Sequence, residues 1–413
     1  MKFLRTASSR RLLATLAGLL VAIAAGTAIA VAAAGRGPVP PPSSLAVALH
    51  QAAAAPAVTG ISARISFTNQ LIDSSDLVGS DPILTGATGR LWVSGDHRLR
   101  LELQSDNGDA QIVVNNGSFW ISDPSAHTVY EGTVPEPSPA AANRNHRGTA
   151  GHDQLPTVAQ IQSDLTRLMA HVDLSGAIPS DVAGRAAYTV RVSPQHDGGL
   201  LGAAEVAWDA ARGVPLRVAV YATNDSSPVL QLKATDISYG PVATSVFAIS
   251  PPAGAKVVRI STPAGHSSAA TTDHGSRSRA RKNHTEVIGA AVVARRLPFP
   301  LVAPKTLVGL PRRTVTLLDW GGSPAALVAY GQNLGGIAVI EQTASSATGA
   351  ESQGANQDHG SGFSLPTVSI NHATGQELDT ALGTMVRFTR GGVTFTVVGS
   401  VPPAAADAAA RAL

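Results

Sequence analysis

The sequence has no cysteine, few aromatic residues and few charges. The absence of cysteine from all 413 residues excludes disulfides, thiolate metal sites, cysteine nucleophiles and a cysteine-linked lipid anchor. Aromatic residues make up 4% and charged residues 14%, so the cores must be mainly aliphatic. Lys and Arg number 31 against 28 Asp and Glu, and a net charge of +3 is too small to indicate nucleic-acid binding over the whole chain.

The sequence motifs of common enzymes are also missing. There is no G-x-S-x-G, no Walker loop, no dinucleotide fingerprint and no H-E-x-x-H. The 12 histidines are scattered, and the glutamates form no readable acid–base pair. We therefore expect a binding protein rather than an enzyme, with no catalytic residues, no metal site and no cofactor.

The N-terminus predicts export. Four basic residues, Lys2, Arg5, Arg10 and Arg11, precede an uncharged run over 12–35. This is the pattern of a signal peptide, and the run of 24 residues is also long enough to span a bilayer, which takes about 20. Residues 1–36 are thus either a cleaved signal or an uncleaved anchor. Both place the rest of the chain outside the cytoplasm, in the cell envelope or secreted.

Composition divides the remainder into four parts. Residues 37–44 form a Pro-rich spacer, and 45–260 show the two-residue periodicity of β-strands. Residues 261–285 are rich in Ser, Thr, His and Arg, which predicts a disordered basic linker. Residues 286–413 predict a small second α+β domain that ends in an Ala-rich helix.

Alternating hydrophobic residues predict an antiparallel sheet with one wet face. Leu99, Leu101 and Leu103 alternate with charged residues, and Asn116-Gly117 is a strong hairpin signal. Arg390-Gly391-Gly392 predicts a second hairpin, in the C-terminal part. A loop over 135–154 is followed by a predicted helix over 157–172.

An aliphatic sheet face must be covered, and we expect helix 157–172 to be the cover. If the cover is incomplete, the remaining apolar surface suits acyl chains, at about 0.8 kcal/mol per buried CH₂. The alternative is that these residues form ordinary core. Trp92 and Trp120, on the opposite strand phase, are either rim residues or packed on the outer face. The candidate lipid-binding residues are Leu99, Leu101, Leu103, Ile112, Val114, Leu165, Leu168, Met169, Val218, Val220, Leu230 and Leu232.

Several phrases resemble a known family of exported proteins. Residues 184–194, GRAAYTVRVSP, resemble the "G-R-x-A-Y-x-L-x-V-x-P" strand of actinobacterial LolA-like proteins. The stretches 96–103, 115–120 and 200–218 continue the resemblance, which covers roughly residues 45–258. The second part, 286–413, is similar in layout to the smaller domain of RseB (MucB)-like proteins. This chain lacks a lipobox cysteine, so lipoprotein sorting is not carried over.

The resemblance implies an α+β fold, with an antiparallel half-barrel sheet covered by helices and a small C-terminal domain. It implies an envelope protein that binds a lipid or an acylated protein in an apolar half-barrel cavity. The alternative is an RseB-like sensor that binds an anti-sigma factor or another membrane partner. No nucleic-acid partner is expected.

Overall fold

A computed structural model describes residues 37–72, 82–104, 109–123, 127–133, 155–196, 198–260, 288–320, 323–344 and 365–413. The predicted signal or anchor over 1–36, the loop over 135–154 and the linker over 261–285 lie outside the described residues. Among the described residues, no helix is both long and apolar enough to cross a membrane.

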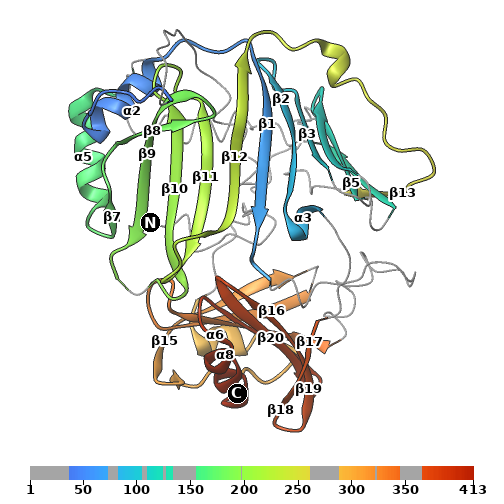
Figure 1. Ribbon diagram of the computed structural model, residues 1–413. Helices are drawn as coiled ribbons and strands as arrows, with labels where there is room; N and C mark the ends of the chain where they lie inside the picture. The colour runs from blue at the N-terminus through green and yellow to red at the C-terminus, as the bar shows by residue number, and fades with distance from the viewer. Residues whose placement is uncertain are drawn as a thin grey trace, which may run out of the picture.

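The first part of the chain forms one strongly curved sheet of thirteen strands (Figure 1). The strand order is β13-β6-β5-β4-β3-β2-β1-β12-β11-β10-β9-β7, and β8 also pairs with β9. All neighbours are antiparallel except β13 and β6. The predicted α+β half-barrel is confirmed. Its strands are β1 (Gly60–Asn69), β2 (Ala87–Ser94), β3 (Leu99–Gln104), β4 (Ala110–Asn115), β5 (Ser118–Asp123), β6 (Thr128–Thr133), β7 (Val172–Leu174), β8 (Ile178–Val182), β9 (Arg185–Pro194), β10 (Leu201–Asp209), β11 (Pro215–Ala222), β12 (Pro228–Tyr239) and β13 (Lys256–Ile260).

Both predicted hairpins are present. Asn116 and Gly117 join β4 to β5 with φ of 49° and 73°, the left-handed pair that a two-residue turn needs. Gly391 and Gly392 make the equivalent turn in the second sheet, with φ of 58° and 77°. Because turn length fixes strand register, these residues also decide which side chains share a face.

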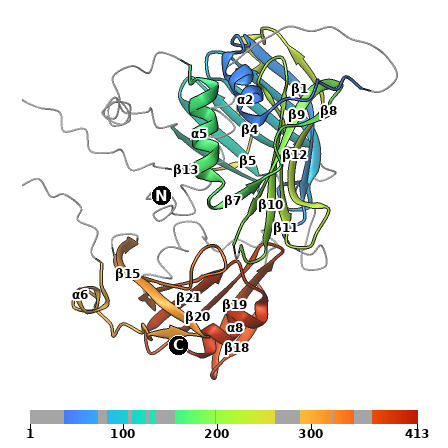
Figure 2. The same cartoon turned by 90° about the vertical axis from the view of Figure 1, so that its left-hand side faces the viewer.

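Two helices lie side by side near the β7–β9 end of the first sheet (Figures 1 and 2). Helix α2 (Leu45–Ala54) begins at Ser44, whose hydroxyl accepts from the Val47 N–H at 3.3 Å. Helix α5 (Val158–Leu168) begins at Thr157 with a reciprocal capping box to Gln160. The other helical pieces among the described residues of this part are α3 (Pro82–Thr85) and the 3₁₀ turn η3 (Thr244–Val246).

The second sheet has eight strands in the order β14-β15-β16-β17-β21-β20-β19-β18. Helix α8 (Pro403–Arg411) packs its buried alanines on β20 and β21, and Phe388 and Phe395 stack with centroids 5.2 Å apart in the core. The elements are α6 (Ala290–Ala294), β14 (Thr306–Leu307), β15 (Leu310–Trp320), β16 (Ser323–Tyr330), β17 (Ile337–Thr343), β18 (Thr367–Ile370), β19 (Ala373–Thr380), β20 (Gly383–Arg390) and β21 (Val393–Gly399).

The two sheets touch through backbone groups of short loops. The Leu200 N–H donates to the carbonyl and the hydroxyl oxygen of Ser400, each at 3.0 Å. The Ala381 N–H donates to the Leu71 carbonyl at 2.8 Å. Leu200 directly precedes β10, and the Thr223 N–H after β11 donates to the Leu200 carbonyl. The contact therefore joins the second sheet to the ends of strands that carry candidate site residues.

Candidate functional site

The register places all nine candidate strand residues on one face of the first sheet. Leu99 lies opposite Val114 and Leu101 opposite Ile112, while Val218 lies opposite Leu232 and Val220 opposite Leu230. The intervening strands continue the same face, because Ala63 of β1 lies opposite both Leu91 of β2 and Ile237 of β12. We call this surface the apolar face; it extends from β4 through β11 to β9, because Val206 of β10 lies opposite both Val218 of β11 and Val190 of β9.

Burial divides the apolar face into two kinds of residue. Leu103 is 6% exposed and belongs to the buried core, and Leu99, Leu101 and Leu232 pack against that core while half-buried. These four are ordinary core or its margin. A second group is half-buried but joins none of the buried clusters in the described part of the chain. Its members are Ile112, Val114, Val218, Val220 and Leu230.

Helix α2 covers the β9–β10 end of the apolar face. Leu45, Leu49 and Ala52 of this helix pack with Tyr188 and Trp208. These three residues are spaced along one helical face, which is the sequence signal for this role that was not used in predicting the cover.

Helix α5, the expected cover, lies against α2. The His50 ring of α2 is 2.9 Å from the Pro156 carbonyl just before α5. No residue of α5 is buried: Leu165 is half-buried, and Leu168 and Met169 are 46% and 39% exposed. The apolar side of α5 thus does not pack tightly on the sheet. The helix also ends at Leu168 rather than at the expected residue 172.

Tyr188 and Trp208 are site-face residues that sequence reasoning did not select. They lie opposite each other on β9 and β10, with ring centroids 6.1 Å apart. The Tyr188 hydroxyl donates to the Pro41 carbonyl at 2.7 Å, which ties the Pro-rich spacer to the sheet. Trp208 is 5% exposed, and its indole N–H has no hydrogen-bond acceptor among the described residues. A buried donor of this kind costs about 1–3 kcal/mol when unpaired.

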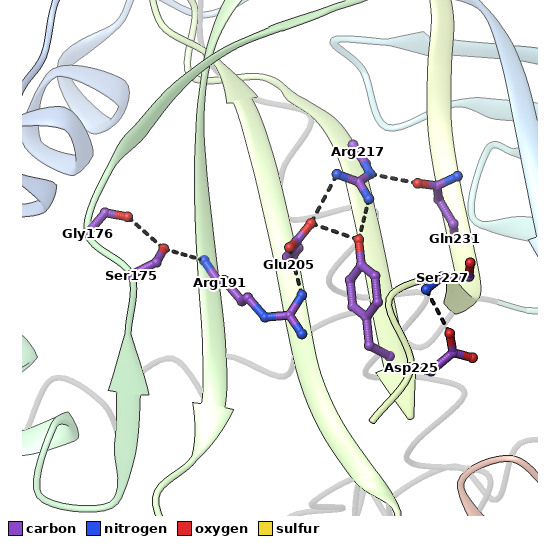
Figure 3. Close-up of polar contacts among 9 residues, drawn as sticks. Ser175, Gly176, Arg191, Glu205, Arg217, Asp225, Ser227 and Gln231 are labelled. Carbon is purple, nitrogen blue, oxygen red and sulfur yellow. Dashed lines mark hydrogen bonds and ion pairs between the residues drawn. The ribbon is translucent and has the colours of Figure 1, made fainter. Parts of the chain in front are cut away.

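The opposite face of β9–β12 carries a polar network centred on Glu205 (Figure 3). Its carboxylate is 2.9 Å from the Arg191 guanidinium and 3.0 Å from that of Arg217, and it accepts from the Tyr221 hydroxyl at 2.9 Å. Arg217 also donates to Gln231 at 2.6 Å, and Arg191 lies over the Tyr221 ring. Burial, then the bond to Glu205, raises the pKa of Tyr221. Every member of the network forms a hydrogen bond or an ion pair with a residue of a neighbouring strand, so the network stabilises the sheet.

The two tryptophans of the first strands also lie on this outer face. Trp92 lies opposite Ser62 and Arg100, and the Arg100 guanidinium is 5.3 Å from its ring centre. Trp120 lies opposite Val113 and Glu131. The register places both on the outer face, and both are half-buried there.

Acidic and histidine side chains gather nowhere in the described residues in a group of three or more that could hold a metal ion. His146, His152 and the linker histidines lie outside the described residues. What the described part of the chain presents for a ligand is therefore an aliphatic surface, one end of which is covered by α2.

Comparison with known proteins finds similarity only among solved structures. No family model matches the chain, and no curated protein matches it. A complex of MucB with MucA(peri) is 16% identical with a TM-score of 0.39, and the match covers 89% of this chain and 95% of that one. A LolA superfamily protein from Nitrosomonas europaea is 8% identical with a TM-score of 0.20, covering 50% and 99%. A conserved protein from Thermus thermophilus is 12% identical with a TM-score of 0.31, covering 52% and 98%.

These structures include both classes that the sequence resembles, the LolA-like and the RseB (MucB)-like proteins. At TM-scores below 0.5 the similarity carries no conclusion about function. The chain is similar to these proteins, and its own strand order and register are what define the half-barrel.

Proposed function

We propose that this chain is an extracytoplasmic binding protein that holds the acyl chains of a lipid or of an acylated protein on its apolar face. The observation that carries the proposal is the group of Ile112, Val114, Val218, Val220 and Leu230. These aliphatic side chains share one face, remain half-buried, and join no buried cluster of the described residues.

The arrangement of helices supports the same function. Helix α2 covers one end of the apolar face, whereas α5 leaves Leu168 and its C-cap Met169 exposed and buries none of its residues. An acyl chain that lay along the face would bury both surfaces, at about 25 cal/mol per Å² of apolar area removed from water.

Export is part of this proposal. The basic and then uncharged N-terminus supports it, and residues 12–35 would act as a cleaved signal or as an anchor in the cytoplasmic membrane.

The first experiment is a binding assay with a fluorescent fatty acid and the variant Val220→Lys. A charge placed on the apolar face should weaken probe binding by at least tenfold, because the ammonium would have to be desolvated beside the acyl chain. The matched control is Val398→Lys, since Val398 is 40% exposed in the second sheet. Equal probe affinity in the two variants would reject the apolar face as the site.

A second candidate is binding of an anti-sigma factor or another membrane partner. MucB is known in a complex with MucA(peri), but a fold likeness at this level transfers no partner. The observation on this chain that favours the candidate is the second sheet, which touches the first at the ends of β10 and β11. Cross-linking in the host envelope, with a photoreactive residue at position 398, tests this candidate function. Partner binding through the second sheet predicts a cross-link to one envelope protein, and the absence of a cross-link would count against it.

A further inference from the structure

The outer face of the four central strands carries a row of cations, which we call the basic patch: Arg64 of β1, Arg90 of β2, Arg217 of β11 and Lys233 of β12. Arg217 lies directly opposite Lys233, and Arg64 directly opposite Arg90. Lys233 lies opposite Ser66, two residues from Arg64 on the same strand, so the two pairs are neighbours.

Two opposed like-charge pairs in one sheet are costly. Directly opposite like charges destabilise a sheet, by up to about 1 kcal/mol per pair. Arg217 is compensated by Glu205 and is bonded to Gln231 and Tyr221. The side chains of the other three cations, Arg64, Arg90 and Lys233, make no hydrogen bond or ion pair with any described residue.

The acidic neighbours of the basic patch do not offset it. Asp236 lies opposite Arg64, and Glu102 lies opposite Arg90, but Glu102 is ion-paired to Arg100. Among the described residues that the register places directly opposite Arg64, Arg90 or Lys233, Asp236 is therefore the one carboxylate without an ion pair. Both arginine side chains are exposed, so the patch faces solvent with an excess of positive charge.

The residues around the basic patch are suited to phosphate. Ser66, Thr68 and Thr88 share the outer face with it, and hydroxyl groups donate readily to phosphate oxygens. Trp92 lies two residues beyond Arg90 on the same face and is half-buried. Arginine together with tryptophan and small hydroxyl residues is a composition suited to the headgroup level of a membrane, where Trp places an apolar ring beside a polar edge.

We propose that the basic patch docks this protein on a membrane surface, through the phosphate headgroups of anionic phospholipids. The patch lies on the opposite side of the sheet from the apolar face. A protein docked in this way turns the apolar face away from the bilayer that it sits on. The inference does not depend on the proposed acyl-chain site, because it rests on the other face.

The test measures co-sedimentation of the full chain with vesicles of phosphatidylcholine alone or mixed in equal parts with phosphatidylglycerol. The patch variant is Arg64→Gln, Arg90→Gln, Lys233→Gln. The control is Arg295→Gln, Arg296→Gln, Arg313→Gln, which removes the same charge from exposed sites outside the first sheet. Each cation near an anionic membrane contributes about fivefold to binding, so the patch variant should lose at least tenfold in affinity for the mixed vesicles. The control should lose less than about twofold, and added salt should abolish the difference.

Three results would overturn the proposal. Equal losses of vesicle affinity in both variants would mean that net charge alone drives binding. Unchanged affinity of the patch variant would mean that the basic patch does not bind the phospholipid headgroups. Equal binding of the parent chain to both kinds of vesicle would assign the membrane contact to apolar segments.

Fatty-acid probe binding, measured in the same variants, should not change; its loss would bear on the acyl site and not on docking. A rise in thermal stability of the patch variant would show that it folds, since removing opposed like charges relieves repulsion.

Discussion

Glu341 is a carboxylic acid in the core of the second sheet, with an exposed fraction of 0%. One of its oxygens accepts from the Val302 N–H at 2.9 Å, and the other has no partner among the described residues. Burial outweighs that single bond and raises the pKa of Glu341 to about 7 from its usual 4.5. The acid is therefore uncharged in the folded protein at mildly acidic pH.

The pKa of Glu341 predicts how stability depends on pH. Between about pH 4.5 and 7 the folded state holds a proton that the unfolded chain releases, so the free energy of unfolding falls as pH rises through this window. Across this window the titration of Glu341 should lower the free energy of unfolding by about 3 kcal/mol in total. The variant Glu341→Gln should not show this decrease. Urea unfolding of both proteins across this range measures it. A parent profile parallel to that of the Gln variant would show that Glu341 is charged or solvated in the fold.

Val218 and Ala219 provide a residue-level test of whether the apolar face is filled. They are neighbours on β11 and point to opposite faces; Val218 is half-buried, and Ala219 is 1% exposed. If the apolar face is open, Val218→Trp should cost less than about 1 kcal/mol in unfolding free energy and should block fatty-acid binding. Ala219→Trp should cost about 1–3 kcal/mol or more, because its surroundings are already packed. Equal costs in chemical denaturation would mean that both faces are filled.

Individual elements were predicted from the sequence where one local rule acts alone. Asn116-Gly117 and Gly391-Gly392 need left-handed backbone, so the hairpins were evident. The alternation around Leu101 fixed which face is aliphatic, because side chains alternate strictly along a strand. Strand β8 was missed, since Pro179 and Asp181 disguise its pattern. Strand β13 was missed because it adds in parallel to the far edge beside β6, a pairing set by tertiary contacts.

The role of the helices could not be predicted from the pattern. The spacing of Ile161, Leu165 and Leu168 predicts an apolar side for α5, and the helix exists, but the sequence does not say what that side meets. In the structure α2 packs on the sheet, and α5 lies beside α2. Whether a predicted aliphatic face is filled depends on the distance between elements, which alternation does not encode.

Helix α5 should be a locally stable element with little effect on the whole fold. Thr157 and Gln160 form its capping box, and none of its residues is buried. The variant Thr157→Ala should lose about 1 kcal/mol of helix stability, which corresponds to roughly fivefold faster amide exchange over residues 158–168. The midpoint of global unfolding should stay within error. A matching fall in the global midpoint would mean that α5 is part of the main cooperative unit.

On the scale of the whole molecule, the two sheets are joined at Gly199 and Ser400. Gly199 has φ of +62°, and a Cβ on it would stand 1.9 Å from the Ser400 carbonyl oxygen. The variant Gly199→Ala should therefore separate the two sheets without unfolding either of them. The matched control is Gly184→Ala, which carries a similar φ of +69° but has open space around its Cβ position.

The absence of cysteine makes this separation measurable. Spin labels at Thr235→Cys and Arg313→Cys, one exposed site in each unit, report the distance between them without background labelling. The expected result is a broadened, shifted distance distribution in Gly199→Ala and an unchanged one in Gly184→Ala. If Gly199→Ala keeps the parent distribution, contacts other than this loop hold the sheets together.

The central claim is that the apolar face holds acyl chains. Its most direct test is native mass spectrometry, followed by organic extraction, of the protein exported by a bacterial host. The account predicts a bound phospholipid or acylated species at close to one per chain, lost in Val220→Lys and kept in Val398→Lys. A clean unliganded mass that does not shift when lipids are added would contradict it, because the apolar face would then be filled by the protein itself.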